Sequence, residues 1–308
     1  MLEINLSGLK LSTPIILASG ILGVSYSSMN RVINAGAGAV TTKSIGPIPR
    51  KGYRNPSIIE IYPGTFINAV GLGNPGIDDF ITEINEIKSH NITLIVSVFG
   101  DTNEVYLDVA TKAANAGADA IEINISCPHA EVSSIGIDKN LTYEIVKFIK
   151  DSISIPLFVK LNPNVTNIGE IALAAEKGGA DGVVAINTVS ALRIDVNTKR
   201  PILSHGSGGL SGKAIHPIAV KKVYDLYKIL NIPIIGCGGI DSWSDVVEFF
   251  LAGASAVQIG TALHGGVEVI SEINLGVINY LKVNEFKCIE DIKGLAHQFK
   301  TQEEPEFD

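Results

Sequence analysis

Short apolar runs alternate with amphipathic stretches along most of the chain. Four segments repeat one pattern, in which Gly and Ala end a helical stretch and open an apolar run: AGAGAV at 35–40, AGADAIEINIS at 116–126, GGADGVVAINT at 178–188 and AGASAVQIGT at 252–261. Glycine ends helices and permits a tight turn into a buried strand, so each repeat predicts a helix, a turn and a strand. Repetition of this junction predicts a parallel sheet built from βα units.

Four further apolar runs bring the predicted strands to eight, at residues 15–19, 94–99, 157–161 and 234–236. Helical patterns lie between the strands, for example at 78–89, 104–116, 141–152, 168–177, 215–230 and 242–251. Eight βα units predict an α/β protein with a (β/α)8 TIM barrel rather than an open doubly wound sheet. The segment ASGILG at 18–23 also lacks the glycine spacing of a dinucleotide-binding fold.

Three segments do not fit the βα repeat. EINLSGLKLSTP at 3–14 alternates polar and apolar residues around Ser7 and Gly8, which predicts a β-hairpin that closes the bottom of the barrel. Residues 44–72 and 194–213 follow strands and are rich in turn-forming residues. We expect them to be irregular inserted loops on the C-terminal face, where barrel enzymes place their active sites. No linker separates these parts, so residues 1–308 are predicted to form one domain.

Composition narrows the class of protein. Hydrophobic residues make up 46% of the 308 residues, charged residues 18%, and the net charge is -8. The apolar share suffices for a large core, whereas the negative charge and the scattered Lys and Arg argue against a nucleic-acid partner. The first ten residues contain charges where a signal peptide would be apolar, and no stretch approaches the ~20 apolar residues of a membrane span, so we expect a cytoplasmic protein.

Polar residues and glycines stand at the carboxyl ends of the predicted strands. They are Lys43, Ser44, Asn124, Cys127, Lys160, Asn187, Thr188, Gly238, Gly239, Gly260 and Thr261, with Asn68 to Leu72 in the first insertion. Each of them alone has an ordinary explanation as a turn residue, a surface charge or a small buried side chain. Because the ends of barrel strands meet at one face, we expect all of them to share one site.

The side chains in this set suit a planar, charged ligand. Asn68, Asn124 and Asn187 each offer a donor and an acceptor, so they could bind a ring edge of alternating N–H and C=O groups. Lys43 could neutralise a carboxylate, and Lys160 could stabilise negative charge on a reduced flavin ring. Together they predict a binding site for a planar heterocycle.

Two further features indicate a phosphate site and proton chemistry. Gly238 and Gly239 precede a predicted helix, and Gly260 and Thr261 end the last strand, which predicts a phosphate cradle of backbone N–H groups. Cys127 precedes a proline that favours a loop, and a nearby cation would make its thiol a base or a nucleophile. No second Cys or His lies at ligand spacing from Cys127, so no metal site is predicted.

Seven motifs are distributed along the chain: TTKS at 41–44, NAVGLGNPG at 68–76, EINISCP at 122–128, VKLNPN at 159–164, INTVSALRIDVNTKRPIL at 186–203, GGLSGKAIHP at 208–217 and GCGGI at 236–240. With them the chain resembles the cytosolic (class 1) dihydroorotate dehydrogenases. The resemblance implies FMN-dependent oxidation of (S)-dihydroorotate to orotate in de novo pyrimidine (UMP) biosynthesis. The segment HAEVSSIGIDKN at 129–140 departs from the family, whose members often have Asn and then a Gly-rich stretch there.

The resemblance also implies roles for individual residues. One non-covalent FMN would contact Ser19, Lys43, Ser44, Asn124, Lys160, Ile186, Gly212, Gly238, Gly239, Gly260 and Thr261. Orotate would contact Lys43, Asn68, Ala69, Val70, Gly71, Leu72, Asn124, Asn187 and Thr188. Cys127 would be the catalytic base that removes the C5 proton while a hydride passes from C6 to flavin N5.

The electron acceptor divides this family into two branches. Class 1A enzymes are homodimers that use fumarate, whereas class 1B enzymes use NAD through a second subunit that holds FAD and a [2Fe–2S] cluster. RIDVNTKRPIL followed by GSGGLSG resembles class 1B. We therefore expect a homodimer that binds such an electron-transfer subunit, as a heterotetramer. The three cysteines Cys127, Cys237 and Cys288 are too few for a cluster on this chain.

Three alternatives are consistent with the same barrel. A reductase of uracil or thymine, like dihydropyrimidine dehydrogenase, would not need Lys43 because its substrate has no carboxylate. A non-redox phosphate-binding lyase or isomerase would use Lys160 as a Schiff-base amine and would be colourless. A non-catalytic interaction subunit would leave the set of strand-end residues unexplained.

Overall fold

The predicted βα repeat forms a closed barrel. The computed structural model of the chain describes residues 1–125 and 135–299. Eight parallel strands close the barrel in chain order: β3 (Ile15–Leu17), β4 (Ala39–Thr41), β7 (Leu94–Val98), β8 (Ala120–Asn124), β9 (Leu157–Lys160), β10 (Gly182–Ala185), β15 (Ile234–Cys237) and β16 (Ala256–Ile259). Each of them overlaps a predicted strand, so the TIM-barrel prediction is confirmed.

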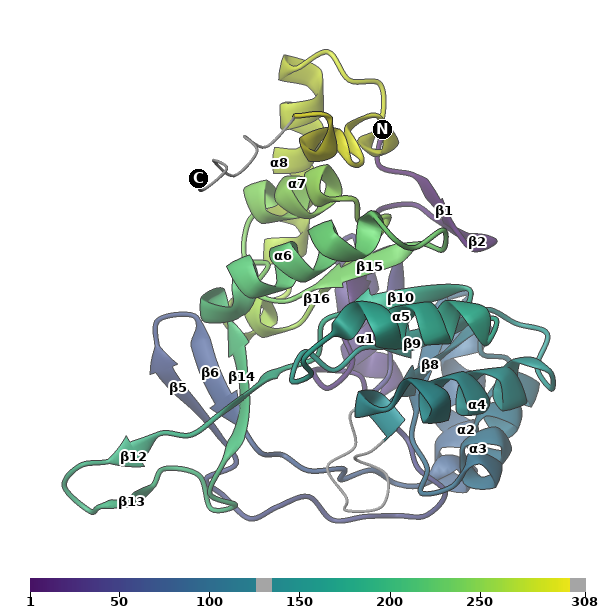
Figure 1. Cartoon of the computed structure of the whole chain (residues 1–308), viewed down its shortest axis with the longest axis vertical. Coiled ribbons are helices and arrows are strands. Elements are labelled where there is room, and N and C mark those ends of the chain that lie inside the picture. Colours follow the sequence, from purple (N-terminus) through teal and green to yellow (C-terminus); the bar gives the residue numbers. More distant parts are fainter. Residues whose placement is uncertain (126–134, 300–308) are drawn as a thin grey trace, which may run out of the picture.

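In the described part of the chain, eight α-helices surround the barrel (Figure 1). They are α1 (Tyr26–Asn34), α2 (Ile77–Ser89), α3 (Asn103–Asn115), α4 (Lys139–Lys150), α5 (Ile168–Lys177), α6 (His216–Tyr227), α7 (Trp243–Ala252) and α8 (Val269–Val283), with short 3-10 turns at Ile135–Ile137, Lys213–Ile215, Thr261–Gly265, Ile289–Ile292 and Leu295–Gln298. Side chains of Ser25, Thr102, Asp138 and Asn167 accept hydrogen bonds from the first turns of α1, α3, α4 and α5, and such caps stabilise helix starts.

The helix predicted at 215–230 is shorter than expected. A 3-10 turn, Lys213–Ile215, precedes it, and the α-helix begins at His216 with a proline in its first turn. Proline fits the first turn because the N–H groups there have no partner within the helix. The helix ends at Tyr227. The apolar pattern of the sequence continues past this residue into the following turn, so it did not show where the helix ends.

The barrel strands are buried on both faces. All residues of β3, β4, β7, β9, β10 and β16 are buried, because helices cover the outside and side chains fill the inside. Most of the buried apolar residues form one cluster that extends from Leu2 to Ile292. This double burial is why the strands appear in the sequence as continuous apolar runs instead of alternating ones.

The N-terminal hairpin lies where the sequence predicted it. Strands β1 (Ile4–Leu6) and β2 (Leu9–Leu11) pair antiparallel, and the turn residues Ser7 and Gly8 both have positive φ, at 50° and 93°. The Ser7 hydroxyl donates a hydrogen bond of 2.6 Å to the carbonyl of Asp181, which directly precedes β10. The hairpin therefore closes the N-terminal end of the barrel.

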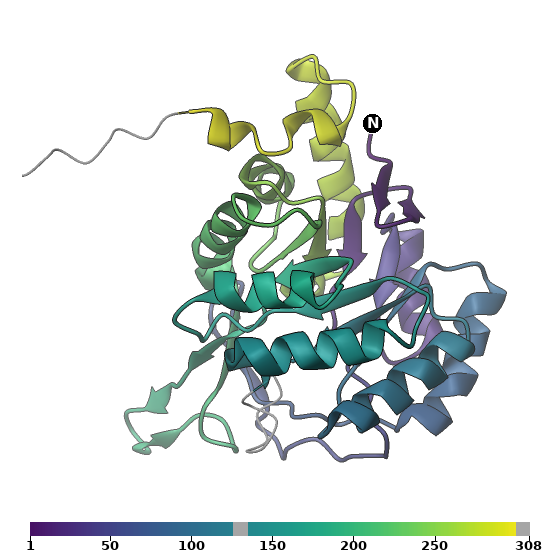
Figure 2. The same cartoon turned by 45° about the vertical axis from the view of Figure 1, so that its right-hand side comes forward.

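The two insertions contain strands, so the prediction of irregular loops was wrong in this respect. β5 (Ile58–Tyr62), β6 (Thr65–Asn68), β11 (Val189–Ala191) and β14 (Gly208–Gly212) form an antiparallel sheet in the order β11-β14-β6-β5, and β12 (Ile194–Asp195) pairs with β13 (Arg200–Pro201). Figures 1 and 2 both show this sheet projecting from one side of the barrel. Glycine-rich β14 has no alternating pattern, and its pairing with β6 and β11 makes it a strand.

None of the helices in residues 1–125 and 135–299 has both the length and the hydrophobicity needed to cross a lipid bilayer.

Candidate active site

Side chains from four strand ends form a hydrogen-bonded row across the C-terminal mouth of the barrel. Asn187, after β10, donates from Nδ2 to Oδ1 of Asn124 over 3.4 Å. Asn124, at the end of β8, donates from Nδ2 to Oγ of Ser44 over 3.1 Å. The hydroxyls of Ser44 and Ser97 are 2.9 Å apart. The structure thus brings together Ser44, Asn124 and Asn187, although 80 and 63 residues separate them along the chain.

Buried groups hold this row in place. The Tyr106 hydroxyl, on α3, donates to the backbone carbonyl of Asn124 over 2.9 Å, and the Tyr106 side chain is fully buried. The Ser97 backbone N–H donates to the Thr42 hydroxyl over 3.0 Å. Because these supports lie in rigid strands and in a buried helix face, the Asn124 and Ser44 side chains are positioned before any ligand binds.

Lys43 brings a partly desolvated cation to the mouth. It follows β4, and its backbone N–H donates to the carbonyl of Gly23 over 2.8 Å. Burial lowers the pKa of the Lys43 ammonium below its usual value, and no neighbouring charge in the described part of the chain contributes to that shift. A half-buried ammonium without a counter-charge gains from an anionic ligand, because the ligand restores the electrostatic stabilisation that was lost with water.

Lys160 is the second cation, and it is more deeply buried. Only 6% of the residue is exposed. It ends β9, its Nζ donates to Oε1 of Gln258 over 2.6 Å, and Nζ lies 3.3 Å from Sγ of Cys237. The Gln258 amide donates in turn to Oε2 of Glu122 over 2.7 Å. Sequence analysis did not single out Glu122 or Gln258, although a polar residue inside the apolar runs AIEIN and AVQIG was a usable signal.

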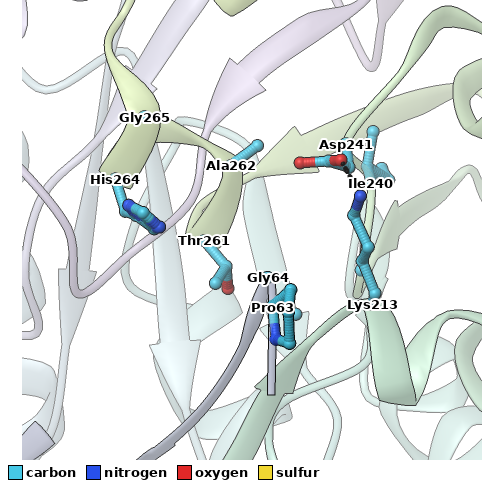
Figure 3. Close-up of a pocket in the computed structure, with 11 residues that line it drawn as sticks. Pro63, Gly64, Lys213, Ile240, Asp241, Thr261, Ala262, His264 and Gly265 are labelled. Carbon is cyan, nitrogen blue, oxygen red and sulfur yellow. Dashed lines mark ion pairs between the residues drawn. The ribbon is translucent and has the colours of Figure 1, made fainter. Parts of the chain in front are cut away.

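A cavity of about 230 Å³ opens at the same end of the barrel, where β15, β16 and β14 end (Figure 3). It is lined by Pro63, Gly64, Gly212, Lys213, Gly239, Ile240, Asp241, Thr261, Ala262, His264 and Gly265. Three predicted cofactor residues, Gly212, Gly239 and Thr261, therefore line one cavity. Gly238 and Gly260 do not line it but adjoin residues that do.

Two of these glycines stand at positions where the backbone has no space for a side chain. A Cβ on Gly212 would lie 2.0 Å from the Gly64 carbonyl oxygen, and a Cβ on Gly239 would lie 2.7 Å from Cβ of His216. Both glycines also have positive φ, 85° and 70°, which L side chains rarely adopt. The bare backbone around this cavity fits a phosphate group held by N–H donors.

An ion pair at the cavity was not predicted. Lys213 Nζ lies 2.6 Å from Oδ2 of Asp241, and Figure 3 shows the two side chains facing each other at one side of the cavity. Hydrogen bonding to Asp241 raises the pKa of the Lys213 ammonium. Both groups are largely exposed, so water and salt weaken the pair and it can open for an anionic ligand.

The remaining predicted residues lie around the same face. Asn68 ends β6 and donates from Nδ2 to the carbonyl of Gly209 over 3.1 Å. Ala69, Val70, Gly71 and Leu72 follow it in a half-buried loop. The Thr188 backbone N–H donates to Oδ1 of Asn187 over 2.7 Å.

Ser19, Ile186 and Cys127 complete the predicted set. Ser19 is half-buried just after β3. Ile186 is 1% exposed, and its N–H donates to the carbonyl of Cys237 over 2.8 Å. Cys127 lies outside the described residues, three positions after Asn124 in the chain.

The arrangement suits one kind of ligand pair. Amide and hydroxyl groups can bind a polar ring edge, the Lys43 ammonium can bind a carboxylate, and the glycine-lined cavity can hold the phosphate of a second molecule. A buried ammonium, that of Lys160, ends the strand next to the one that carries Asn124. Such a site can bring a small acid and a phosphorylated cofactor together.

Comparisons with known proteins agree with this chemistry. The dihydroorotate dehydrogenase family model matches residues 1–281. A relative from Pyrococcus horikoshii, "Dihydroorotate dehydrogenase B (NAD(+)), catalytic subunit", is 52% identical over 299 residues, which cover 96% of this chain and 98% of the relative. A protein of the same name from Methanocaldococcus jannaschii is 45% identical over 305 residues, covering 97% and 99%.

The fold also matches a solved structure. The crystal structure of DHODH from Eimeria tenella in complex with ferulenol superposes with a TM-score of 0.84, over 97% of this chain and 89% of that chain. The sequence identity is 24%, so this likeness supports the barrel fold alone.

Proposed function

The chain belongs to the dihydroorotate dehydrogenase family, and from this membership we propose which of its residues carry out the reaction. It is an oxidoreductase that oxidises dihydroorotate to orotate in pyrimidine biosynthesis. The reaction removes a proton from C5 and a hydride from C6 of the ring. It therefore needs an anchor for the substrate carboxylate, a base on one side of the ring and a hydride acceptor on the other.

Lys43 is the proposed anchor of the carboxylate. Its ammonium is half-buried, and burial lowers its pKa with no compensating charge from residues 1–125 and 135–299, so a carboxylate is the partner that stabilises it most. The amides of Asn68, Asn124 and Asn187 bind the polar edges of the substrate ring, supported by the row that joins Asn187, Asn124 and Ser44. Ala69 to Leu72 and Thr188 enclose the ring. The observation that carries the proposal is this hydrogen-bonded row together with the glycine-lined cavity at the same end of the barrel.

Cys127 is the proposed base. It follows Asn124 by three residues in the sequence, and the proposal rests on its match to the catalytic cysteine of the family's EINISCP motif. A cysteine thiolate can accept the C5 proton at working pH when a cation such as that of Lys43 lies nearby.

The family is flavin-dependent, and we propose that FMN is held non-covalently, one per chain. Gly212, Gly239 and Thr261, which line the cavity of about 230 Å³, would bind its phosphate together with the adjoining Gly238 and Gly260. Ser19, Lys43, Ser44, Asn124, Lys160 and Ile186 surround its ring system. When bound, FMN supplies the hydride acceptor. The residues fit this group because glycines line the cavity, and a Cβ at Gly212 or Gly239 would collide with neighbouring protein atoms, so the backbone there stays bare.

Replacing Gly239 with alanine is expected to weaken FMN binding by about five- to a hundredfold. The added Cβ would lie 2.7 Å from Cβ of His216 and 2.8 Å from the Gly212 carbonyl oxygen, and overpacking costs about 1–3 kcal/mol, where 1.4 kcal/mol is tenfold in affinity. The affinity is measured by fluorescence titration of the cofactor-free protein. Gly117→Ala is the matched control, since Gly117 also has positive φ, at 106°, but lies in the turn before β8 and not at the cavity, and its Cβ would meet only Lys88 at 3.4 Å. Equal FMN affinity in both variants would refute the cradle.

We also propose the acceptor and the partner of this subunit. The relatives named above are catalytic subunits of an NAD(+)-linked enzyme, and a catalytic subunit implies a partner subunit. Such a partner would hold FAD and a [2Fe–2S] cluster, because this chain has three dispersed cysteines in all. The proposed assembly is a cytoplasmic heterotetramer, built on a homodimer of this chain.

The purified chain is expected to be yellow and to bleach when L-dihydroorotate is added without oxygen. The flavin absorbance falls because the substrate passes its hydride to the cofactor and no acceptor restores the oxidised form. A yellow protein that uracil-like compounds bleach and dihydroorotate does not would overturn the substrate assignment. A colourless protein that fails to take up added FMN would overturn the flavin site itself.

A further inference from the structure

Three polar side chains form a chain of hydrogen bonds inside the barrel. Lys160, Gln258 and Glu122 are 6%, 1% and 1% exposed. The Lys160 ammonium donates to Oε1 of Gln258 over 2.6 Å, and Nε2 of Gln258 donates to Oε2 of Glu122 over 2.7 Å. The three residues come from β9, β16 and β8, and neither Gln258 nor Glu122 takes part in the proposed reaction.

The direction of the Gln258 amide is determined by its two neighbours. An ammonium can only donate hydrogen bonds and an ionised carboxylate can only accept them. Turning the amide over would place its NH2 group against the Lys160 ammonium and its oxygen against the Glu122 carboxylate. Both short bonds involve a charged group, which is the strong kind of hydrogen bond. The amide is therefore held in one orientation.

The three groups lie at different depths in the barrel. Asn124 pairs with Lys160 in the register of β8 and β9, whereas Glu122 pairs with Phe158, so Glu122 starts two residues deeper than Lys160. Opposite charges inside a barrel attract each other strongly, and a lysine side chain is long and flexible enough to move toward a carboxylate below it. The Gln258 amide occupies the space between them and keeps the ammonium near the mouth.

Glu122 has a further feature. Its second oxygen, Oε1, is buried and has no hydrogen-bond partner in the part of the chain that the structure describes. Burying a carboxylate with one unpaired oxygen destabilises the folded protein. The Glu122 carboxylate offsets this cost by compensating the positive charge of Lys160. The negative charge of Glu122 also weakens the positive electrostatic potential that Lys160 creates for a molecule bound at the mouth.

We propose that Gln258 and Glu122 are positioning residues for Lys160. Gln258 is a spacer that holds the ammonium at the mouth, and Glu122 orients that spacer while it partly offsets the positive charge offered to a flavin ring. This inference rests on the proposed FMN site. It predicts that the two residues shift the properties of a bound flavin in opposite directions.

The test uses sulfite as a probe of charge beside the flavin. Sulfite adds reversibly to oxidised flavins and leaves negative charge on the ring, so nearby positive charge tightens its binding. Sulfite affinity is measured by flavin absorbance, and the reduction potential is measured by equilibration with a redox dye, both without substrate turnover.

Gln258→Ala lets Lys160 move toward Glu122, so sulfite is expected to bind about tenfold more weakly and the reduction potential of the flavin is expected to fall. Glu122→Gln removes the opposing charge and keeps an acceptor for Gln258, so sulfite is expected to bind more tightly, by up to about tenfold, and the potential to rise.

Two further variants separate this effect from general damage. In the double variant Glu122→Gln with Gln258→Ala, Lys160 has no carboxylate to approach, so sulfite affinity is expected to return toward that of the unchanged protein. Glu144→Gln removes the same charge from an exposed position on α4 and is expected to change nothing. If Gln258→Ala does not fold, Gln258→Met preserves the volume, removes the hydrogen bonds to Lys160 and Glu122, together with a longer one of 3.4 Å to the Thr41 hydroxyl, and is expected to weaken sulfite binding in the same direction.

The results distinguish this inference from the proposed function. If the unchanged protein binds FMN and is bleached by dihydroorotate but both single variants shift sulfite affinity in the same direction, or neither shifts it, the positioning role is wrong and the function stands. If the unchanged protein neither binds FMN nor bleaches, the proposed function fails first. Opposite shifts with recovery in the double variant would support the spacer directly, since structural damage alone has no reason to change sign.

Discussion

Replacing Cys127 with alanine is expected to slow the bleaching of the flavin by dihydroorotate about a hundred- to ten-thousand-fold, the usual contribution of a positioned general base. The alanine variant has no group in place to accept the C5 proton. Hydride transfer from C6 is therefore slow, because the removal of that proton must accompany it. FMN content and orotate affinity are expected to remain close to those of the unchanged protein. The rate is measured by anaerobic rapid mixing, with orotate titration as the binding measurement.

The cysteines of the chain provide a matched control for this prediction. Cys288 lies at the start of a short 3-10 turn, where its N–H donates to Asp291 over 2.9 Å, and serine suits that capping position. Cys288→Ser is therefore expected to bleach at the unchanged rate. If Cys127→Ala also bleached at the unchanged rate, the base would have to be another group, and the role proposed for Cys127 would be lost.

Replacing Lys43 with methionine is expected to weaken orotate binding by about a hundredfold. Methionine preserves the length and the apolar packing of the side chain but removes the ammonium. Losing one partner of a buried, hydrogen-bonded charge pair costs about 2–5 kcal/mol, and each 1.4 kcal/mol is tenfold in affinity. Orotate affinity is measured from the change in flavin absorbance on titration. Retained orotate affinity in the variant would mean that another group binds the carboxylate.

The pH dependence of orotate binding gives a second test of Lys43. Burial lowers the pKa of its ammonium below the usual 10.5, so the ammonium loses its proton at lower pH than an exposed lysine does. Orotate is therefore expected to bind more weakly as the pH rises through that lowered pKa, whereas the Lys43→Met variant lacks this loss. An identical alkaline decline in both proteins would assign the titration to a different group.

The same shift has a consequence for stability. A lysine whose pKa is lower in the folded than in the unfolded chain binds fewer protons when folded, between the two pKa values. The free energy of unfolding is then expected to rise with pH across that window in the cofactor-free protein, by the linkage between proton binding and folding. The slope should be smaller in Lys43→Met, and denaturant unfolding at several alkaline pH values measures it.

Local patterns in the sequence were enough for the barrel. The four junctions of the AGA or GGA type each mark the end of a helix and the start of a strand, and this information lies within about ten residues of chain. Strands buried on both faces must be apolar throughout, so β7 and β10 are visible as runs of Ile, Val and Ala. The hairpin at Ser7 and Gly8 is similarly local, because a tight turn requires residues that accept positive φ.

The face of the barrel that bears the candidate site residues could also be predicted from the sequence, once the barrel fold was predicted. Strand ends of a parallel barrel meet at one face, so Asn124, Lys160 and Asn187 could be assigned to one site before any contact was known. Their chemical roles came from the family resemblance instead. The role of Cys127 stays a prediction, since that residue lies outside the described part of the chain.

Only the tertiary structure decided which distant groups pair with each other. GGLSG becomes strand β14 because β6 and β11 provide hydrogen-bonding edges, and no local propensity of glycine predicts that. Lys160 and Gln258 are 98 residues apart, and Gln258 and Glu122 are 136 apart, so their contact depends on closure of the barrel. The sequence by itself determined the repeating elements and the face that bears the site, because short-range patterning and strand direction control both. The partners of buried polar groups were decided by packing, because each of those groups must find its hydrogen bond inside the folded barrel and not along the chain.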